Sequence, residues 1–133
     1  MEAPIKNEAW KSTVKGLPGS FKNAFSGIKV LVSFEKNARI HLIILLLVII
    51  AGIVLKISPA HWIVVTLAAG LVLASECLNT SIEYLCDSIL PEYNSGIKKA
   101  KDLAAAGVLV SALAAIITGL IVFIPAFCRF FGS

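Results

Sequence analysis

Three long apolar stretches dominate this chain and restrict what it can fold into. Residues 40–55 are apolar apart from His41, and residues 57–75 and 103–128 contain no formal charge. A membrane-crossing helix needs about 20 apolar residues, or fewer when flanking side chains reach the interface. The 133 residues are 58% hydrophobic and only 15% charged, which is the composition of an integral membrane protein. We therefore predict one all-α membrane domain over residues 1–133, with transmembrane helices at 38–57, 59–89 and 100–126.

The segment before the first apolar stretch has the pattern of an amphipathic helix. Apolar side chains recur there at three- and four-residue spacings: Phe21, Ala24, Phe25, Ile28, Leu31 and Val32. Such a helix lies on a membrane surface, where Lys22 and Lys29 would gain from anionic lipid headgroups. Packing against the protein's own helices is the alternative. We predict a polar tail over residues 1–16 and a surface helix over residues 17–36.

The basic residues are distributed unequally about the predicted spans. Ten of the 12 lysines and arginines precede the first span or lie between the second and third, which leaves Lys56 and Arg129. Because basic loops remain in the cytoplasm, we expect a cytoplasmic N-terminus and an external C-terminus. Lipid headgroups account for the net charge of +4, so no nucleic-acid partner is expected.

Polar side chains form a stripe at the end of the second apolar stretch: Glu76, Asn79, Glu83 and Asp87. At about 100° per residue, they lie within about 80° of one another around a helix. Ionisable groups in a membrane segment are costly and seldom occur without a partner or a function. Three carboxylates on one face indicate a cation site. With Lys101 and Asp102 at the start of the third span, they indicate metal-phosphate chemistry on a lipid.

Glu76 is the deepest ionisable group of the stripe. Desolvation makes a carboxylate a better proton acceptor, which suits a general base for a lipid hydroxyl. A hydrogen bond between helices of neighbouring chains is the structural alternative. Asn79 could orient Glu76 or a phosphate oxygen, or it could join helices, as asparagine often does in membranes.

Glu83 lies nearer the membrane surface and is a candidate magnesium ligand. Magnesium usually takes one or two carboxylates together with waters and phosphate oxygens. Glu35 could supply the second carboxylate, although it could equally be a solvated charge paired with Lys36 or Arg39. The basic cytoplasmic loop expected from the topology accounts for the charges of Lys98 and Lys99. For Lys101 and Asp102 we favour a role in the site, because a lysine can pair with a β- or γ-phosphate.

Several common sites are missing from the sequence. It contains no GxxxxGK[ST], GxGxxG or HExxH motif, so any ATP chemistry would use carboxylates and lysines. Cys77, Cys86 and Cys128 lack metal-ligand spacing and are read as small apolar residues. Small side chains recur along the third span, and three spans cannot easily enclose so many polar groups, so we expect an oligomer.

The stripe resembles the signature of a known family. Residues 76–87 read ECLNTSIEYLCD, which is similar to the E-x-L-N-[TS]-[AS]-I-E-x-x-x-D motif of the small bacterial membrane kinases. That family contains prokaryotic diacylglycerol kinase and undecaprenol kinase. Residues 91–93, the Lys101-Asp102 pair, and Glu35 with the ARIH run at 38–41 resemble further parts of it. The likeness covers residues 21–122.

The resemblance implies a homotrimer in the bacterial inner (cytoplasmic) membrane, with active sites shared between neighbouring subunits. It implies that Glu76 is the general base and that Glu35 and Glu83 hold Mg²⁺ with the ATP phosphates. It further implies that the remaining polar residues contact nucleotide or orient the reacting groups: Asn79, Asp87, Lys101 and Asp102. The expected reaction is transfer of the γ-phosphate to the hydroxyl of a membrane lipid.

One position departs from part of the family. The diacylglycerol-specific enterobacterial members carry a second glutamate six residues after the first, where this chain has His41. The ARIH run resembles the undecaprenol kinase branch, which favours a polyprenol over diacylglycerol. A small multidrug-type transporter and a purely structural membrane protein are the rival interpretations. An odd number of spans disfavours the transporter, because it makes an inverted repeat unlikely.

Overall fold

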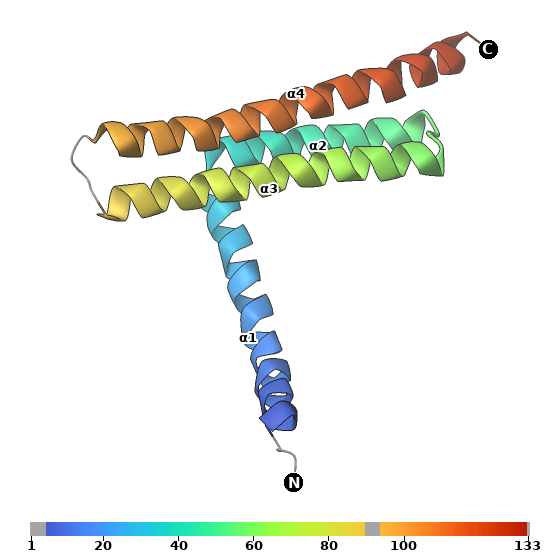
Figure 1. The fold of residues 1–133 in the computed structure, drawn as a ribbon. Helices are drawn as coiled ribbons and strands as arrows, with labels where there is room; N and C mark the ends of the chain where they lie inside the picture. The colour runs from blue at the N-terminus through green and yellow to red at the C-terminus, as the bar shows by residue number, and fades with distance from the viewer. Residues whose placement is uncertain (1–4, 90–93, 133) are drawn as a thin grey trace. The chain divides into compact units, whose positions relative to one another are not determined.

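The computed structural model describes residues 5–89 and 94–132, with side chains from residue 19, and these ranges contain four helices (Figure 1). Helix α1 (Ile5–Phe34) belongs to one compact unit. The other unit begins at Glu35 and holds α2 (Lys36–Val54), α3 (Pro59–Ile89) and α4 (Ser95–Phe131). Consecutive helices of this second unit run antiparallel. Helix α3 packs against both of its neighbours, more extensively against α4 than against α2.

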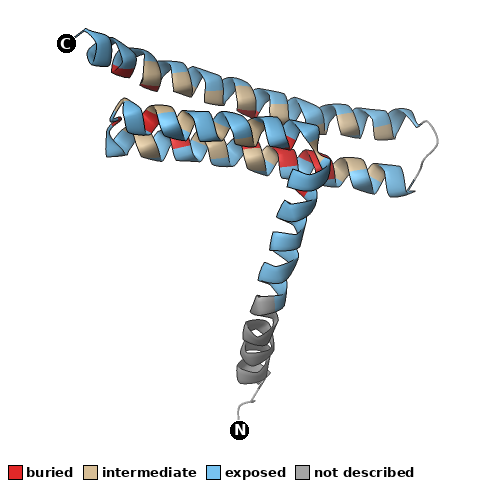
Figure 2. Cartoon of the chain, turned by 180° about the vertical axis from the view of Figure 1, so that it is seen from behind, coloured by how far each residue is buried: buried red, intermediate tan, exposed pale blue. Residues whose placement is uncertain are grey.

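The three helices of the second unit are each long and apolar enough to cross a membrane. Most of their side chains are exposed, and buried positions are few (Figure 2). A surface of isoleucine, leucine and valine is suited to lipid rather than water. The prediction of an all-α protein with three candidate spans is therefore confirmed.

The helix ends differ modestly from the expected ones. Helix α3 has the predicted bounds. Helix α2 covers Lys36–Val54 where 38–57 was expected, and α4 covers Ser95–Phe131, through Pro125, where 100–126 was expected. Residues 90–93 of the predicted loop lie outside the described residues. Helix α1 begins at Ile5, so it includes most of the segment expected to be a polar tail. That α1 lies on a membrane surface stays a prediction.

The turn between α2 and α3 is closed by backbone and side-chain hydrogen bonds. The Ile57 N–H donates to the Gly52 carbonyl at 3.1 Å, and the Lys56 N–H donates to the Ile53 carbonyl at 3.2 Å. These bonds form a Schellman motif, in which Lys56 takes the left-handed conformation at φ 49°. Ser58 then accepts a hydrogen bond from the His61 N–H at 3.3 Å. The predicted Ser58-Pro59 helix start is confirmed.

Gly52 allows α2 and α3 to approach closely near this turn. A Cβ at this position would lie 2.7 Å from Cη2 of Trp62 and 3.1 Å from Cδ1 of Ile57. Ile57 belongs to a small buried cluster with Val65, Val122 and Ala126, and Trp62 packs against it. Any side chain at position 52 would therefore displace the indole of Trp62.

We expect Gly52→Leu to destabilise the second unit by about 1–3 kcal/mol, the usual cost of overpacking. Thermal unfolding in detergent, followed by circular dichroism, measures this change. The matched control is Gly70→Leu, because a Cβ at Gly70 meets no atom within 4 Å. Equal midpoints for the two variants would show that the Gly52–Trp62 contact does not determine stability.

Candidate active site

The polar stripe of α3 becomes progressively more exposed toward the end of the helix. Glu76 is only 2% exposed and Asn79 is 8% exposed. Glu83 is half-buried, and Asp87 is exposed. The predicted stripe thus passes from the interior of the helical bundle to its surface along one helix face.

Two buried oxygen atoms of the stripe have no hydrogen-bond partner in the described part of the chain. They are Oε2 of Glu76 and Oδ1 of Asn79. The amide nitrogen of Asn79 donates to Oε1 of Glu83 at 3.1 Å. Burial of an unpartnered carboxylate oxygen is costly, so these atoms mark a place where a ligand would find acceptors. Among the described residues, Asn79 forms its hydrogen bond to Glu83 along the same helix and makes none to another helix.

Two residues at or near the start of α2 lie close enough to Glu76 to act on it electrostatically. They are Glu35 and His41, and Glu83 acts on Glu76 in the same way. Glu35 is the N-cap residue of α2, but its side chain makes no capping hydrogen bond. It also takes part in neither of the two ion pairs found among the described residues. Glu35 therefore does not form the alternative ion pair with Lys36 or Arg39.

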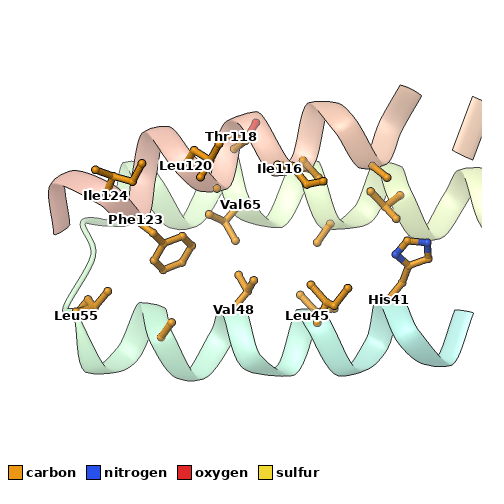
Figure 3. A pocket seen from close by; sticks show the side chains of 18 of the residues that line it. His41, Leu45, Val48, Leu55, Val65, Ile116, Thr118, Leu120, Phe123 and Ile124 are labelled. Carbon is orange, nitrogen blue, oxygen red and sulfur yellow. The ribbon is translucent and has the colours of Figure 1, made fainter. Parts of the chain in front are cut away.

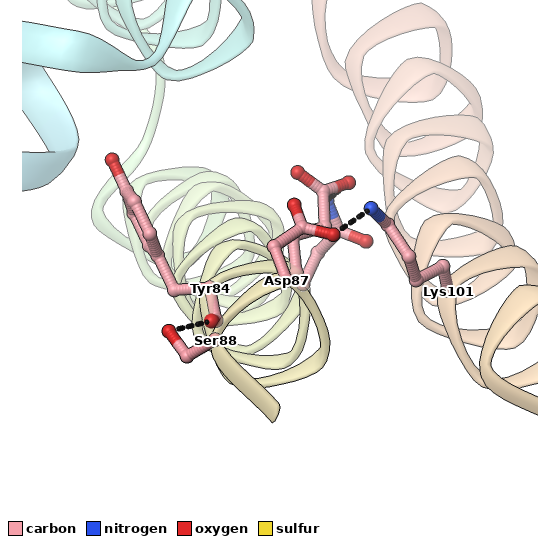
Figure 4. A network of polar contacts seen from close by, with 6 residues as sticks. Tyr84, Asp87, Ser88 and Lys101 are labelled. Carbon is pink, nitrogen blue, oxygen red and sulfur yellow. Dashed lines mark hydrogen bonds and ion pairs between the residues drawn. The ribbon is translucent and has the colours of Figure 1, made fainter. Parts of the chain in front are cut away.

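Ion pairs occupy the outer end of the site, where α3 and α4 extend side by side (Figure 4). The Lys101 ammonium donates to Oδ1 of Asp87 at 2.8 Å, which links the two helices. The Lys98 ammonium donates to Oδ2 of Asp102 at 2.6 Å within α4. Lys101 and Asp102 are thus neighbours in sequence that engage different partners. Exposed pairs of this kind contribute little to stability, so their charges are available to a ligand.

The start of α4 is fixed by Asn94. Its side-chain oxygen accepts hydrogen bonds from the backbone N–H groups of Gly96 at 2.8 Å and Ile97 at 3.3 Å. This N-cap satisfies donors that a helix end leaves free. It places Lys98, Lys101 and Asp102 in the first two turns of α4.

The residues present fit a divalent cation bound together with phosphate. Carboxylate and amide oxygens are the donors that such a hard cation prefers, and Glu83 and Asn79 supply them beside unpartnered buried oxygens. No group of three histidine, cysteine, aspartate or glutamate side chains surrounds a common point within the described ranges. A cation would therefore complete its ligands with waters and phosphate oxygens, as magnesium commonly does.

Sequence reasoning placed too little weight on His41. Its imidazole lines a large apolar cavity (Figure 3) and lies close enough to Glu76 to act on it electrostatically, whereas in the sequence it stood out only as a departure from part of the family. The available signal was an ionisable residue inside an otherwise apolar span. Thr80 and Ser111 are also buried polar residues that the sequence analysis did not single out as site residues.

The second unit thus defines a class of protein: a three-helix membrane bundle with carboxylates and lysines gathered at one end, suited to phosphate chemistry. The chain belongs to the prokaryotic diacylglycerol kinase family, which matches residues 22–123. It is a lipid kinase of the membrane. Membership in this family sets aside the transporter and purely structural interpretations.

Two relatives have different names. The chain is 35% identical over 106 residues to the undecaprenol kinase of Bacillus subtilis (strain 168), covering 80% of this chain and 86% of the relative. It is 33% identical over 123 residues to the diacylglycerol kinase of Synechocystis sp., covering 92% of this chain and 70% of the relative.

Proposed function

We propose that this chain is an ATP- and Mg²⁺-dependent undecaprenol kinase that transfers the γ-phosphate to the hydroxyl of the lipid. The observation that carries the proposal is Glu76, a buried carboxylate with an unpartnered oxygen in a candidate membrane span. A lipid hydroxyl is a donor that could satisfy this oxygen. His41 and the similarity to the Bacillus enzyme support the polyprenol over diacylglycerol, which is the second candidate substrate.

The proposed reaction is a direct in-line transfer. The lipid oxygen forms a bond to the γ-phosphorus while the bond between that phosphorus and the β–γ bridging oxygen breaks, releasing ADP. The hydroxyl proton passes to the Glu76 carboxylate. Positioning and electrostatic stabilisation supply most of the catalysis in such a transfer. The buried location of Glu76 keeps competing water away from the acceptor.

Glu35 and Glu83 would hold Mg²⁺ together with the ATP phosphates, and the cation would neutralise charge on the transferring phosphate. Asn79 supports this role, because its amide holds Oε1 of Glu83 in place. The free carboxylate of the Glu35 N-cap and its electrostatic link to Glu76 support the second ligand.

Lys101, Asp87 and Asp102 would contact the nucleotide or orient it. Their exposure and their position beyond the buried part of the stripe support an outer, water-facing place for ATP. The Asp87–Lys101 pair has an alternative role as a clamp between α3 and α4. The two roles can be separated by exchanging the charges.

We expect Lys101→Met to raise the KM for ATP by about 10- to 100-fold, the value of a charged hydrogen bond to phosphate. The double variant Asp87→Lys with Lys101→Asp rebuilds the ion pair in the reverse sense. Steady-state kinetics should show that it does not recover the KM. Recovery in the exchanged variant would assign Lys101 to the helix clamp and not to nucleotide binding.

The assembly and its orientation complete the proposal. The protein would act as a homotrimer in the bacterial inner membrane, with a cytoplasmic N-terminus and an external C-terminus. The small residues of α4 support close contact between chains. The exposed apolar side chains Phe21, Phe25 and Ile28 support a position for α1 on the lipid surface, against anionic headgroups.

A competition assay tests the lipid assignment. Undecaprenol and diacylglycerol are offered together in one vesicle with labelled ATP and magnesium, and the two products are separated. We expect the phosphorylated polyprenol to form at least about tenfold faster, the discrimination typical of differently shaped apolar substrates. Faster labelling of diacylglycerol would assign the chain to the second candidate substrate.

A further inference from the structure

Three lysines gather near the start of α4, where Asn94 caps the helix. They are Lys98, Lys99 and Lys101, and the last is followed directly by Asp102. The Lys98 ammonium donates to Oδ2 of Asp102 at 2.6 Å, which is a charge-assisted hydrogen bond between two ionised groups. Asp102 is expected to act in the nucleotide site, and it is held by a lysine to which the sequence assigned no role there.

The stability of α4 does not explain this pair. Both side chains are largely exposed, at 59% for Lys98 and 63% for Asp102, and an exposed pair contributes little to stability. A lysine near the start of a helix faces the positive end of the helix dipole, and a lysine four residues before an acidic residue is the weaker orientation of such a pair. Asn94 already supplies the cap of this helix end. The pair therefore has a position and a direction that the helix would not select for its own stability.

Lys98 and its neighbour Lys99 lie on different faces of α4. At about 100° per residue, Lys98 lies between Lys101 and Asp102, about 60° from the first and about 40° from the second around the helix. Lys99 lies about 160° from Lys101. It is exposed and takes part in neither ion pair of the described residues. Two adjacent lysines of equal charge thus differ in their relation to the proposed nucleotide site.

The pair leaves Asp102 with one unused oxygen. Its Oδ2 accepts from Lys98, whereas no described residue donates to its Oδ1. An ionised carboxylate can only accept hydrogen bonds, so the unused oxygen suits a donor group of a ligand. An exposed aspartate samples several rotamers, and fixing one of them before a ligand arrives lowers the cost of binding. Lys101 cannot do this for Asp102, because residues one apart on a helix do not face each other.

We propose that Lys98 is a positioning residue of the nucleotide site, which holds the Asp102 carboxylate so that its Oδ1 accepts a hydrogen bond from the nucleotide. The inference rests on the proposed function and deepens it, because it adds to the site a lysine whose charge the basic loop alone would explain. Lys98 acts through Asp102 and does not itself contact the nucleotide. Lys101 remains the lysine that pairs with phosphate.

A charge-matched pair of variants gives the first part of the test. Lys98→Met and Lys99→Met each remove one positive charge from adjacent positions, so both change the general attraction of ATP alike. We expect Lys98→Met to raise the KM for ATP by about 3- to 10-fold while kcat changes by no more than about twofold. Lys99→Met should keep the KM within about twofold of the wild type, and so should Lys98→Arg, which retains a donor for Asp102. Steady-state kinetics of the full chain in vesicles with undecaprenol and magnesium measures these values.

A double-mutant cycle gives the second part. Asp102→Ala alone should raise the KM for ATP at least as much as Lys98→Met does. In protein that already carries Asp102→Ala, Lys98→Met should raise the KM no further, because the residue through which it acts is gone. Thermal unfolding midpoints in detergent should agree among all the variants, since the pair is exposed.

Each contrary result has its own meaning. Equal increases in KM for Lys98→Met and Lys99→Met would overturn the inference and assign both lysines to the general attraction of ATP. An increase that persists beside Asp102→Ala would also overturn it, because Lys98 would then bind the nucleotide directly. An unchanged KM in Lys98→Met, or a midpoint lowered in that variant alone, would make the pair a surface contact of the helix. Wild-type protein that phosphorylates neither undecaprenol nor diacylglycerol would refute the proposed function itself.

Discussion

Replacing Glu76 by glutamine is expected to lower kcat for lipid phosphorylation by about 10²- to 10⁴-fold, the usual contribution of a general base. Glutamine has nearly the same shape as glutamate, but it cannot accept the hydroxyl proton. The KM for ATP should change by no more than about twofold, because the loss concerns a transition-state interaction. Steady-state kinetics with undecaprenol as the acceptor measures both parameters.

Stability separates this role from a structural one. Glu76 is buried with an unpartnered oxygen, so removal of its charge should leave the unfolding midpoint unchanged or raise it. Cys77→Ser, at the exposed neighbouring position, is the matched control and should retain activity. A glutamine variant with normal turnover would contradict the base assignment. If the glutamine variant loses activity only because it unfolds, Glu76 has a structural role in holding helices together.

Replacing Glu83 by glutamine is expected to raise the magnesium concentration needed for half-maximal activity by at least about tenfold. The amide of Asn79 can still donate to the oxygen of the new side chain, so the local hydrogen bond survives while the negative charge is lost. Activity should recover in part as magnesium is raised. A magnesium titration at saturating ATP measures the shift.

Ser88→Ala is the control for this titration. Its hydroxyl donates only to the Tyr84 carbonyl within α3, at 2.7 Å, close to the same end of the helix (Figure 4). The control should have the magnesium dependence of the wild type. An unchanged dependence in Glu83→Gln would remove Glu83 from the set of metal ligands and leave Glu35 as its only proposed member.

The helices were predictable because their determinants are local. Long, mostly apolar stretches specify α2, α3 and α4, and the Ser58-Pro59 pair specifies where α3 begins. The shared helix face of Glu76, Asn79 and Glu83 follows from helical periodicity alone. The hydrogen bond between Asn79 and Glu83 is a consequence of the same four-residue spacing.

The contacts between helices were not predictable in the same way. Nothing in the order of residues assigns Lys101 to Asp87 on α3 in place of its neighbour Asp102. The cavity that His41 lines is bounded by short side chains from three different helices. Its volume depends on all three together, so it could not be predicted from the sequence of any one helix. The importance of His41 likewise emerges only when α2 is placed beside α3.

The most direct test of the central claim is the stereochemical course of phosphate transfer. ATP made chiral at the γ-phosphorus with oxygen isotopes is used with undecaprenol, and the configuration of the lipid phosphate is determined. Direct transfer to a hydroxyl activated by Glu76 predicts a single inversion of configuration. Net retention would indicate a phosphorylated protein intermediate and would contradict the account.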